Sequence, residues 1–523
     1  MHRLSVWTTG CVLLLALVTA APGQWIADAA LNTPVCDAVG DTVQPKVAPA
    51  PDGGTYVSWF DNRDGGYDVY LQRITRDGVA LWATNGILIA DLANSSTQDY
   101  GLCADGAGGV YLAFLDTRFG GTVVTVTRVD QDGVQVWGST GKQVSNGGSV
   151  GQPAVALSGD GRPVAAWVRD SVTEARRLEP DGTFAWPVPV TLSAPAAQLW
   201  VADAQSGDGT SVILSMVRQT GFAGAKTLWA QKLDASGASL WPRAHVKVFT
   251  AGSLQFGNFP NFLSDGAGGA VFAFYTTGPL QSWAQRVTAD GSPAWGANGI
   301  AVTVTSAGRE RTGPGFAFDP VTQRTYVAWE ERIANTSQYG VTAQAFDAGG
   351  ARLWGDDGTV IEPVVANFGT HDIEGEVFDG HATFAYVRDL AFNNGTLFAA
   401  QLDDSGALLL NSPLALSSTA SGHSRVETIF NAGPWGASFV AIWQDSRDGD
   451  QNLYGQAMNP DGSLGPPERE TIVGDLDGDG LVNATDLAIL LGAWGSTKGS
   501  PADLDGNGAV DAADLAVLLG AWS

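Results

Sequence analysis

Two acidic segments near the C-terminus carry residue types that bind a hard metal ion. They read GDLDGDGLVNATDLAILLGAWG at residues 474–495 and ADLDGNGAVDAADLAVLLGAWS at residues 502–523. Calcium takes about six to eight oxygen ligands, and a loop of about 12 residues supplies them from positions 1, 3, 5, 7, 9 and 12, with glycine at position 6. The first loop offers Asp475, Asp477, Asp479, the Leu481 carbonyl, Asn483 and Asp486; the second offers Asp503, Asp505, Asn507, the Ala509 carbonyl, Asp511 and Asp514. We therefore expect two calcium ions in this part of the chain.

An apolar helix is predicted directly after each loop. Apolar residues recur there at helical spacing, namely Leu487, Leu490, Leu491 and Trp494, then Leu515, Leu518, Leu519 and Trp522. One such helix alone would expose its apolar stripe to water. We expect the two stripes to pack against each other, so that the duplicated halves fold together around their ions.

No amphipathic helix is predicted before either loop, because residues 465–474 and 495–501 contain proline or glycine and little periodicity. A duplicated calcium loop with only an exit helix, and Asp at position 12, resembles a type I dockerin domain over residues 474–523. The resemblance implies a small all-α domain that folds with calcium and docks onto a cohesin module. Such modules usually occur in assemblies that degrade polysaccharides.

The tail departs from the dockerin pattern at loop positions 10 and 11. Dockerins often carry hydroxyl residues there for partner recognition, whereas this chain has Ala484 and Thr485, then Ala512 and Ala513. The calcium ligands carry over residue by residue, but the cohesin partner does not carry over as directly. A calcium-folded surface-sorting or protein-binding module is the alternative.

The elements between residue 25 and the tail form one repeated unit. Its marker is a strand, a glycine turn and a tryptophan, as in VYLQRITRDGVALW (69–82), LWAQKLDASGASLW (228–241) and SWAQRVTADGSPAW (282–295). Each unit supplies four alternating strands over about 50 to 60 residues, with Asp-Gly or Ser-Gly hairpin turns. This pattern predicts an all-β fold, a β-propeller of four-stranded blades. We count eight blades, with seven as the alternative.

The ends of the repeat array predict how the ring closes. The eighth unit breaks off at PDGSLGPP without its tryptophan, whereas Trp25 and the residues after it resemble the stretch that follows each internal tryptophan. We expect residues 25–38 to lend the missing strand to the last blade, which removes the open sheet edge.

The turns resemble those of two propeller families. Residues 75–78 with Trp82 resemble the Asp-box of sialidase-type propellers, and Asp234, Gly237 and Trp241 resemble the tryptophan-docking turn of quinoprotein propellers, each with spacing off by about one residue. These motifs stabilise blades in the families that own them. The resemblance therefore speaks to fold and not to activity.

The charge balance excludes one class of partner. Acidic residues outnumber basic ones 54 to 28, and the net charge is −26. Phosphate backbones and anionic lipid surfaces would be repelled, so nucleic acid is not an expected partner.

The N-terminus has the composition of a cleaved secretory signal, with Arg3, an apolar run from Cys11 to Val18 and a small-residue end. We predict a signal peptide at 1–24, the propeller at 25–465, a linker at 466–473 and the calcium domain at 474–523. No segment is long and apolar enough to predict a transmembrane helix, so we expect a secreted or cell-surface protein. Of the cysteines, Cys36 and Cys103 remain after cleavage; we expect buried free thiols, with one disulfide as the alternative.

The loop after the second strand of most units carries an arginine: Arg63, Arg118, Arg169, Arg218, Arg332, Arg388 and Arg447. A ring of guanidinium groups at one mouth would bind carboxylates bidentately. The preferred interpretation is structural, an arginine-to-aspartate bridge in each blade, because a feature copied into every repeat usually belongs to the repeat.

Residues that break the repeat are the better candidates for function. They are Glu330, Glu331, Glu374, Glu376, His245, His381 and His423. A pair of carboxylates can act as general acid and base in glycoside cleavage. No catalytic residue is assigned, because isolated glutamates on propeller loops are normally solvated and the H-E-x-x-H, G-x-S-x-G and P-loop patterns are absent.

Two functions remain open at the level of the sequence. The favoured one is a secreted, non-catalytic propeller that recognises a glycan or a protein and is tethered through the dockerin-like tail. The alternative is an extracellular glycoside hydrolase or polysaccharide lyase that uses the propeller mouth.

Overall fold

The computed structural model describes residues 24–221, 223–242, 245–255, 257–305, 308–366, 369–410, 413–433, 436–467, 472–476, 481–496 and 500–522. The predicted signal peptide lies outside these ranges except for Gln24. Part of the predicted linker and part of the first predicted calcium loop, including Asp477 and Asp479, also lie outside the described residues.

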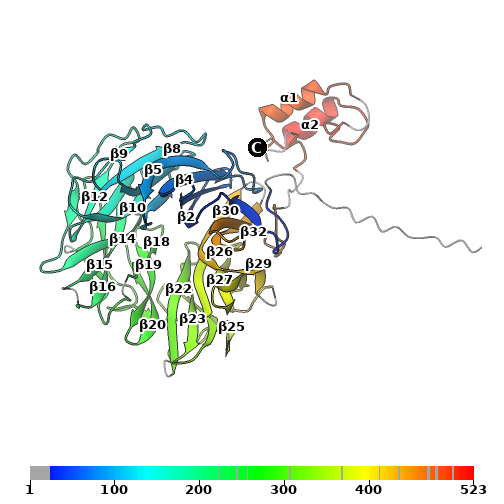
Figure 1. Ribbon diagram of the computed structural model, residues 1–523. Coiled ribbons are helices and arrows are strands. Elements are labelled where there is room, and N and C mark those ends of the chain that lie inside the picture. The colour runs from blue at the N-terminus through cyan, green and yellow to red at the C-terminus, as the bar shows by residue number, and fades with distance from the viewer. Residues whose placement is uncertain are drawn as a thin grey trace, which may run out of the picture.

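Within the described residues, eight four-stranded antiparallel sheets surround one axis and form an eight-bladed propeller (Figure 1). Blades 1 to 4 are β2 (Thr42–Pro49), β3 (Thr55–Asp61), β4 (Tyr67–Ile74), β5 (Ile87–Asn94); β6 (Gly101–Ala104), β7 (Val110–Asp116), β8 (Val123–Val129), β9 (Lys142–Gln143); β10 (Val150–Leu157), β11 (Pro163–Arg169), β12 (Val172–Arg177), β13 (Val190–Leu192); and β14 (Gln198–Ser206), β15 (Val212–Gln219), β16 (Lys226–Leu233), β17 (Val246–Phe249).

Blades 5 to 8 continue around the ring. They are β18 (Phe262–Ser264), β19 (Ala270–Thr277), β20 (Leu280–Val287), β21 (Ile300–Ala301); β22 (Arg309–Asp319), β23 (Arg324–Ile333), β24 (Gln338–Phe346), β25 (Thr359–Ala366); β26 (Gly369–Phe378), β27 (His381–Ala391), β28 (Asn394–Leu402), β29 (Leu414–Ser421); and β30 (His423–Gly433), β31 (Gly436–Asp445), β32 (Asn452–Met458), β1 (Thr33–Cys36). The predicted eight blades are confirmed, and the seven-bladed alternative is wrong.

The second strand of a blade is covered on both faces. Every residue of β3 and β7 is buried, and both strands are dominated by aromatic and aliphatic side chains. Apolar clusters span neighbouring blades, so each sheet packs face to face against the next one. Buried and partly exposed residues alternate instead in first and fourth strands such as β2 and β5, where part of each strand meets water.

The ring closes as predicted from its ends. Strand β1 pairs with β32, the third strand of blade 8, with Thr33 opposite Gly455 and Pro34 opposite Tyr454. Figure 1 shows this N-terminal segment lying beside the last blade and next to β2 of the first. The last blade therefore combines strands from both ends of the chain, and its outer edge is supplied by the N-terminus.

A tryptophan from each blade except blade 7 packs on the hairpin turn of the next blade. Trp25 donates its indole N–H to the Arg76 carbonyl at 2.8 Å, and Trp241 donates to the Ala289 carbonyl at 2.9 Å. Equivalent bonds join Trp137 to Pro180, Trp186 to Ala235, Trp295 to Ala348 and Trp354 to Asp404. Trp25 thus takes the place of the missing eighth tryptophan, and it docks the closing segment onto blade 1.

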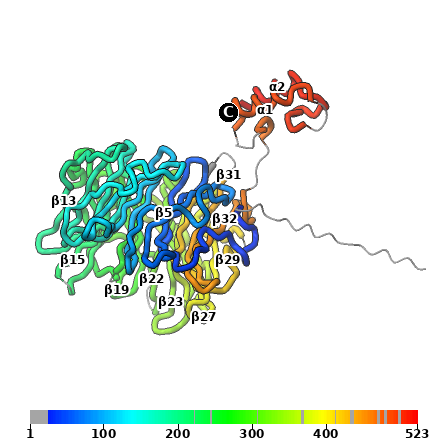
Figure 2. Tube along the Cα trace, turned by 45° about the horizontal axis from the view of Figure 1, so that its top comes forward, coloured from blue at the N-terminus to red at the C-terminus, as the bar shows by residue number. Residues whose placement is uncertain are grey.

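Two short helices lie apart from the ring in Figures 1 and 2, α1 (Ala484–Gly492) and α2 (Ala512–Gly520). Each begins with a capping box, in which Asn483 or Asp511 accepts from the helix backbone and the next acidic residue, Asp486 or Asp514, accepts in return. Loop residues predicted to bind calcium therefore also start the helices.

The predicted packing of these helices is only partly right. Leu490 and Leu518 are fully buried in a shared apolar cluster, and Leu487 and Leu515 pack against it. Four residues of the predicted stripes are instead exposed, namely Leu491, Trp494, Leu519 and Trp522. Leu491 and Leu519 each follow a buried leucine by one residue and point away from the shared cluster, and Trp494 and Trp522 lie beyond the ends of the two helices.

No described helix combines the length and the apolar composition that a bilayer crossing requires.

We predict that Gly78→Ala destabilises the ring through its contact with Trp25. A Cβ at Gly78 would lie 2.3 Å from the Trp25 backbone nitrogen, at a φ of +93°. Gly65 is the matched control, since its φ is +103° and nothing lies within 4 Å of an added Cβ. Gly65→Ala should lose about 1 kcal/mol from backbone strain alone, and Gly78→Ala about 2 kcal/mol more from the clash. Equal shifts in the thermal unfolding midpoint would contradict the proposed contact.

Candidate functional site

The predicted arginine ring is made of internally paired side chains. Arg63 donates to Asp61 through Nε and Nη2, and Arg118 makes the same two bonds to Asp116. Carboxylate partners also bind Arg169, Arg332, Arg388 and Arg447, whereas Arg218 lies over the ring of Trp229. These contacts agree with the structural interpretation, because a guanidinium already bound to a buried aspartate is not offered to a ligand.

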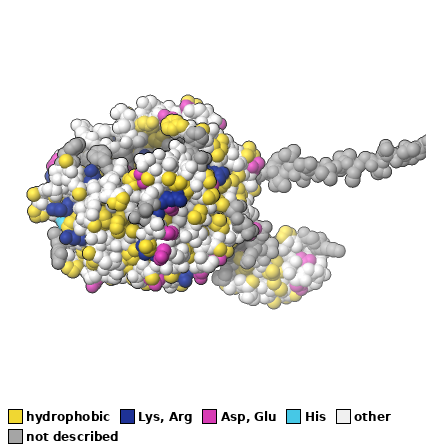
Figure 3. Space-filling model, turned by 90° about the horizontal axis from the view of Figure 1, so that it is seen from below, with side chains coloured by type: hydrophobic (Ala, Val, Ile, Leu, Met, Phe, Trp, Pro, Cys, Tyr) yellow, Lys and Arg dark blue, Asp and Glu magenta, His cyan; other side chains and the backbone are white. Residues whose placement is uncertain are grey.

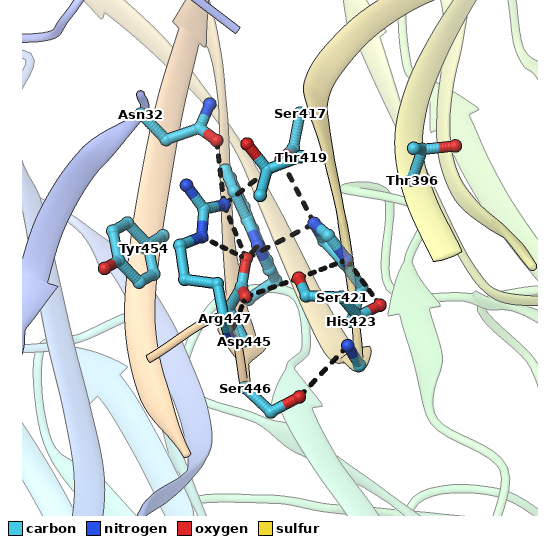
Figure 4. A network of polar contacts seen from close by, with 12 residues as sticks. Asn32, Thr396, Ser417, Thr419, Ser421, His423, Asp445, Ser446, Arg447 and Tyr454 are labelled. Atoms are coloured by element: carbon cyan, nitrogen blue, oxygen red, sulfur yellow. Dashed lines mark hydrogen bonds and ion pairs between the residues drawn. The ribbon is translucent and has the colours of Figure 1, made fainter. Parts of the chain in front are cut away.

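Arg447 has the most extended set of contacts and fastens the closure of the ring. It binds Asp445 of its own blade and donates to Ser417 of β29, and it also reaches the Leu31 carbonyl and Asn32 of the N-terminal segment. Figure 4 shows the guanidinium between Asn32 and Asp445. One side chain thereby joins blade 7, blade 8 and the N-terminus.

His423 belongs to this network and not to a catalytic site. Its Nε2 lies 3.3 Å from Asp445 Oδ2 and 3.1 Å from Ser417 Oγ, and both His423 and Asp445 have 0% exposed side chains. Ser421 donates directly to Asp445 (Figure 4), so it is not oriented as a nucleophile toward a substrate. Burial lowers the pKa of His423. The group is a structural polar core.

The other histidines that break the repeat lie in different places. His245 is buried and bonded to the Ser193 carbonyl at 2.9 Å, and burial lowers its pKa. His381 opens β27, on the far side of a hairpin from β26. His371, which the sequence left aside, bridges Asp372 at 3.1 Å and Asp389 at 3.3 Å.

Glu330 and Glu331 do not act as a pair, because neighbouring strand residues point to opposite faces. Glu331 binds Arg311 at 3.3 Å, whereas Glu330 accepts from Thr312 at 2.8 Å. Glu374 and Glu376 share one face of β26, two residues apart, and Glu374 lines the central cavity of the ring. The structure therefore separates Glu330 from Glu331 and keeps Glu374 and Glu376 on one face, and of these four glutamates Glu374 alone lines the cavity.

The central cavity has a volume of about 910 Å³ and is lined by the first strands of several blades. Its charged residues are Lys46, Asp99, Asp203, Glu374, Arg425 and Glu427. Lys46 contacts Asp99 at 3.0 Å. The cavity thus gathers four carboxylates and two cations from five blades, which no single segment of sequence contains.

Three carboxylates of the cavity, those of Asp203, Glu374 and Glu427, are strongly desolvated. Burial raises the pKa of Asp203 to about 6 and that of Glu427 to about 7, the latter against the opposing charge of Lys46. Burial, followed by repulsion from Glu427, raises the pKa of Glu374 well above its ordinary value. A raised pKa increases the protonated fraction of a carboxyl group, and a protonated carboxyl group can both donate to and accept from hydroxyl groups.

Backbone irregularities place these side chains. The first strands of six blades each carry a register shift at the same height, and the shift ends at Lys46 in blade 1, Glu374 in blade 7 and Glu427 in blade 8. The residues inside the shift include Gln44 and Arg425, both with positive φ. A bulge redirects the side chains that follow it, and bulges of this kind occur next to functional sites.

Sequence reasoning found Glu374 but missed Lys46, Asp203 and Glu427. The usable signal was the set of equivalent first-strand segments, such as VQPK at 43–46, HDIE at 371–374 and SRVE at 424–427. Aligning them places Lys46, Glu374 and Glu427 at one position. That alignment was hidden because the first strand is the least regular part of each repeat.

Both cysteines are free, as predicted. Cys36 is buried and receives a hydrogen bond from Arg63 at 3.3 Å, and burial raises its thiol pKa to about 11. Cys103 lines the cavity wall, and burial followed by the charge of Asp105 raises its pKa to about 12. Neither thiol has thiolate character at neutral pH.

The second C-terminal loop arranges carboxylates around one point. Oxygens of Asp503, Asp505 and Asp514 lie within 4.8 Å of one another. Asp514 accepts from the backbone of Leu504 at 2.6 Å and of Asp511 at 2.8 Å, and the Asp511 bond is the main cause that lowers its carboxyl pKa. Three ionised carboxylates at this separation repel each other unless a cation sits between them.

One oxygen of this loop points to a ligand. Asp503 Oδ1 is buried and has no hydrogen-bond partner among the described residues, although Oδ2 accepts from Gly508 at 3.0 Å. Buried polar oxygens are normally satisfied, so an unpaired one fits coordination to a cation. Asn507 instead turns its side chain toward Asp505 and the Ala509 backbone. In the first loop Asp475, Leu481, Asn483 and Asp486 are described, whereas Asp477 and Asp479 lie outside the described residues.

Residues 473–520 match a family model, the dockerin type I domain. The predicted resemblance of the tail is thereby confirmed, with α1 and α2 following the two loops. No curated protein matches this chain.

Three solved structures are among those similar to this chain. An ulvan lyase of a polysaccharide lyase family has a TM-score of 0.44 and 10% identity, covering 81% of this chain and 94% of its own. The Dos1 propeller has a TM-score of 0.45 and 13% identity, covering 83% and 95%. Prolyl oligopeptidase B from Galerina marginata has a TM-score of 0.41 and 11% identity, covering 78% and 56%. TM-scores this low carry no weight for function.

We predict that Glu376→Gln flattens the pH dependence of stability. Burial raises the pKa of Glu376 from 4.5 to about 8. Between these values the folded state holds a proton that the unfolded state has lost, so stability falls as the pH rises through this window, by up to about 1.4 kcal/mol per pH unit. The variant should show a shallower decline in unfolding midpoint from pH 5 to 8. Exposed Asp379→Asn is the control; identical slopes in wild type and Glu376→Gln would contradict the burial.

Proposed function

We propose that this protein is a secreted, non-catalytic β-propeller that binds a glycan, and that it is held in a larger assembly by a calcium-folded dockerin domain that docks onto a cohesin-type partner. The dockerin match over residues 473–520 is the observation that carries the proposal. The predicted signal peptide at 1–24 supports export. The proposal also includes the domain boundaries, with the propeller at 25–465, a linker at 466–473 and the dockerin domain at 474–523.

Two calcium ions are proposed for the tail, each held by the six ligands predicted from its loop. The clustered carboxylates and the unpaired Asp503 Oδ1 support the second site. The first site rests on its matching sequence and on the equivalent capping box at Asn483 and Asp486. Bound calcium supplies the positive charge that lets the carboxylates of one loop converge while the helices pack.

Exposed apolar residues of the tail support docking onto a protein. Leu491 and Trp494 on one side, and Leu519 and Trp522 on the other, are 51%, 46%, 53% and 45% exposed. Side chains of this size in a segment of about 50 residues form an apolar surface that a stable partner would cover. The two halves present equivalent pairs because the loop and helix are duplicated.

The propeller is assigned a binding role because the arginines that recur from blade to blade have structural contacts, whereas the residues that differ between blades place polar groups in the cavity. Recurring arginines such as Arg63, Arg118 and Arg447 form ion pairs with aspartates of their own blades. On the face seen in Figure 3, cationic and anionic side chains are interspersed among apolar ones, with no broad basic area for nucleic acid. The cavity, with its partly protonated carboxylates, offers donors and acceptors suited to hydroxyl-rich ligands.

A glycoside hydrolase or polysaccharide lyase is the second candidate, and one observation favours it. Glu374 and Glu427 face a large cavity with raised pKa values, as a general acid requires. In this alternative Glu374 protonates the leaving group. The binding role is preferred because the sequence carries none of the H-E-x-x-H, G-x-S-x-G and P-loop patterns of catalytic sites.

We predict that Asp503→Ala weakens calcium binding by at least about tenfold and unfolds the tail at calcium concentrations that keep the wild type folded. Calcium titration calorimetry and hydrogen exchange of residues 512–520 in the full chain measure the two effects. Capture by immobilised type I cohesins should fall in parallel, and in wild type with chelator. Asp132→Ala, on an exposed turn of blade 2, is the control. Unchanged protection of α2 with chelator would refute the calcium-folded tail.

We also predict that at least one polysaccharide from a panel of soluble and insoluble polysaccharides depletes the full chain from solution, and that the protein does not cleave it. The assay scores depletion together with release of reducing and unsaturated ends. Depletion without products supports the proposed function. Release of ends that disappears in Glu374→Gln would overturn the non-catalytic assignment in favour of the enzyme, and absence of both signals across the panel would overturn glycan recognition.

A further inference from the structure

Blade 4 departs from the repeat at the mouth of the cavity. Trp200 of β14 pairs with Val217 of β15, next to the Leu199–Arg218 pair. The equivalent positions in five other blades hold Val43, Gly151, Thr312, His371 and Ser424. Within these described registers, a tryptophan occupies this position in blade 4 alone. An asymmetric feature of this kind belongs to a site and not to the repeat.

Trp200 forms one wall of a second pocket together with Phe259. The two rings meet edge to face, with centroids 6.2 Å apart and an interplanar angle of 72°. Both side chains are half-buried, so each retains a face open to water. The pocket has a volume of about 370 Å³, and its polar lining comes from Ser149, Gln152, Asp170 and Lys226. It thus combines an apolar platform with a few polar groups at its rim.

This pocket adjoins the central cavity, because Gln152 and Phe259 line both spaces. Gln152 lies in the bulge of β10 with a φ of +50°, so the bulge of blade 3 places an amide at the junction. A ligand on the aromatic platform can therefore extend past Gln152 toward Glu374, Glu427 and Lys46 without leaving the mouth.

The shape and chemistry match a sugar chain. A pyranose ring has an apolar face of C–H groups, which packs against an indole, and a rim of hydroxyls, which bonds to amide, carboxyl and ammonium groups. The charges of the cavity favour a neutral glycan over an acidic one. Acidic residues there outnumber basic ones, with Asp99, Asp203, Glu374 and Glu427 against Lys46 and Arg425, and the net charge of the chain is −26.

We propose that Trp200 and Phe259 form the anchoring subsite for a neutral glycan, whose chain continues over Gln152 into the central cavity. This inference rests on the proposed function, since it names the site and the ligand class of the same propeller. Trp200 supplies the stacking platform, and Phe259 holds the indole edge. A polyuronate is disfavoured because its carboxylates would approach the acidic cavity.

The test measures the affinity of the full chain, with calcium present, for cellohexaose, xylohexaose, mannohexaose and polygalacturonate by calorimetry. The wild type should bind at least one neutral hexaose and bind polygalacturonate more weakly. Trp200→Ala and Phe259→Ala should each weaken the neutral hexaose by about tenfold or more, which is the range of a buried aromatic anchor. Trp200→Phe should retain much of the affinity, because it keeps a flat ring.

The control is Phe119→Ala, which removes an exposed aromatic from the loop between β7 and β8 at the same end of the ring. Its affinity should equal that of wild type, and thermal unfolding of all variants identifies any loss of fold. Wild-type binding that survives Trp200→Ala would overturn this subsite and leave the proposed function standing. Tighter binding to polygalacturonate would overturn the neutral ligand class, and no binding to any glycan would overturn the proposed function itself.

Discussion

A ring of blades is stable only if the last blade binds the first as firmly as any other neighbouring pair. One type of contact, repeated between neighbouring blades, joins them around the ring. An aromatic ring from one blade lies on a positive-φ glycine in the turn of the next, from Trp25 on Gly78 to Trp354 on Gly406. Blade 7 uses Leu410 on Gly462 instead. The glycine is required twice, by its backbone conformation and by the closeness of the ring. Strand β1 and the Arg447 network add a second and a third contact where the first and last segments of the propeller meet.

The same constraint explains how much the sequence could predict. Glycine and tryptophan recur because every blade needs them, so blade number, closure and the role of Trp25 follow from the repeat. The dockerin-like tail follows as directly, because calcium fixes both ligand type and spacing. Lys46, Asp203, Glu374 and Glu427 could not be assembled in this way, since they come from four blades and depend on bulges that place each side chain. The exposure of Trp494 and Trp522 was also missed, because an apolar stripe predicts burial without stating what buries it.

The molecule separates stability from recognition along one axis of the ring. The tryptophan turns lie at one end of the blades, where equal contacts repeat. The bulged first strands and the loops near Trp200 lie toward the other end and the cavity, where the blades differ. Desolvated carboxylates destabilise a fold as the pH rises, so the ring must hold them with contacts made elsewhere. The tail has its own apolar core, so the attachment and the ligand binding proposed for this protein rest on separately packed parts of the chain.

Hydrogen exchange of the Trp25→Ala variant tests most directly whether the closing contact holds the ring. If it does, amides of β30, β31, β32 and β1 in blade 8 and of β4 beside the Arg76 turn should lose protection first, while blades 3 to 6 keep wild-type protection. Protection that is unchanged in blade 8, or lost equally around the ring, would contradict the claim that this contact closes the propeller.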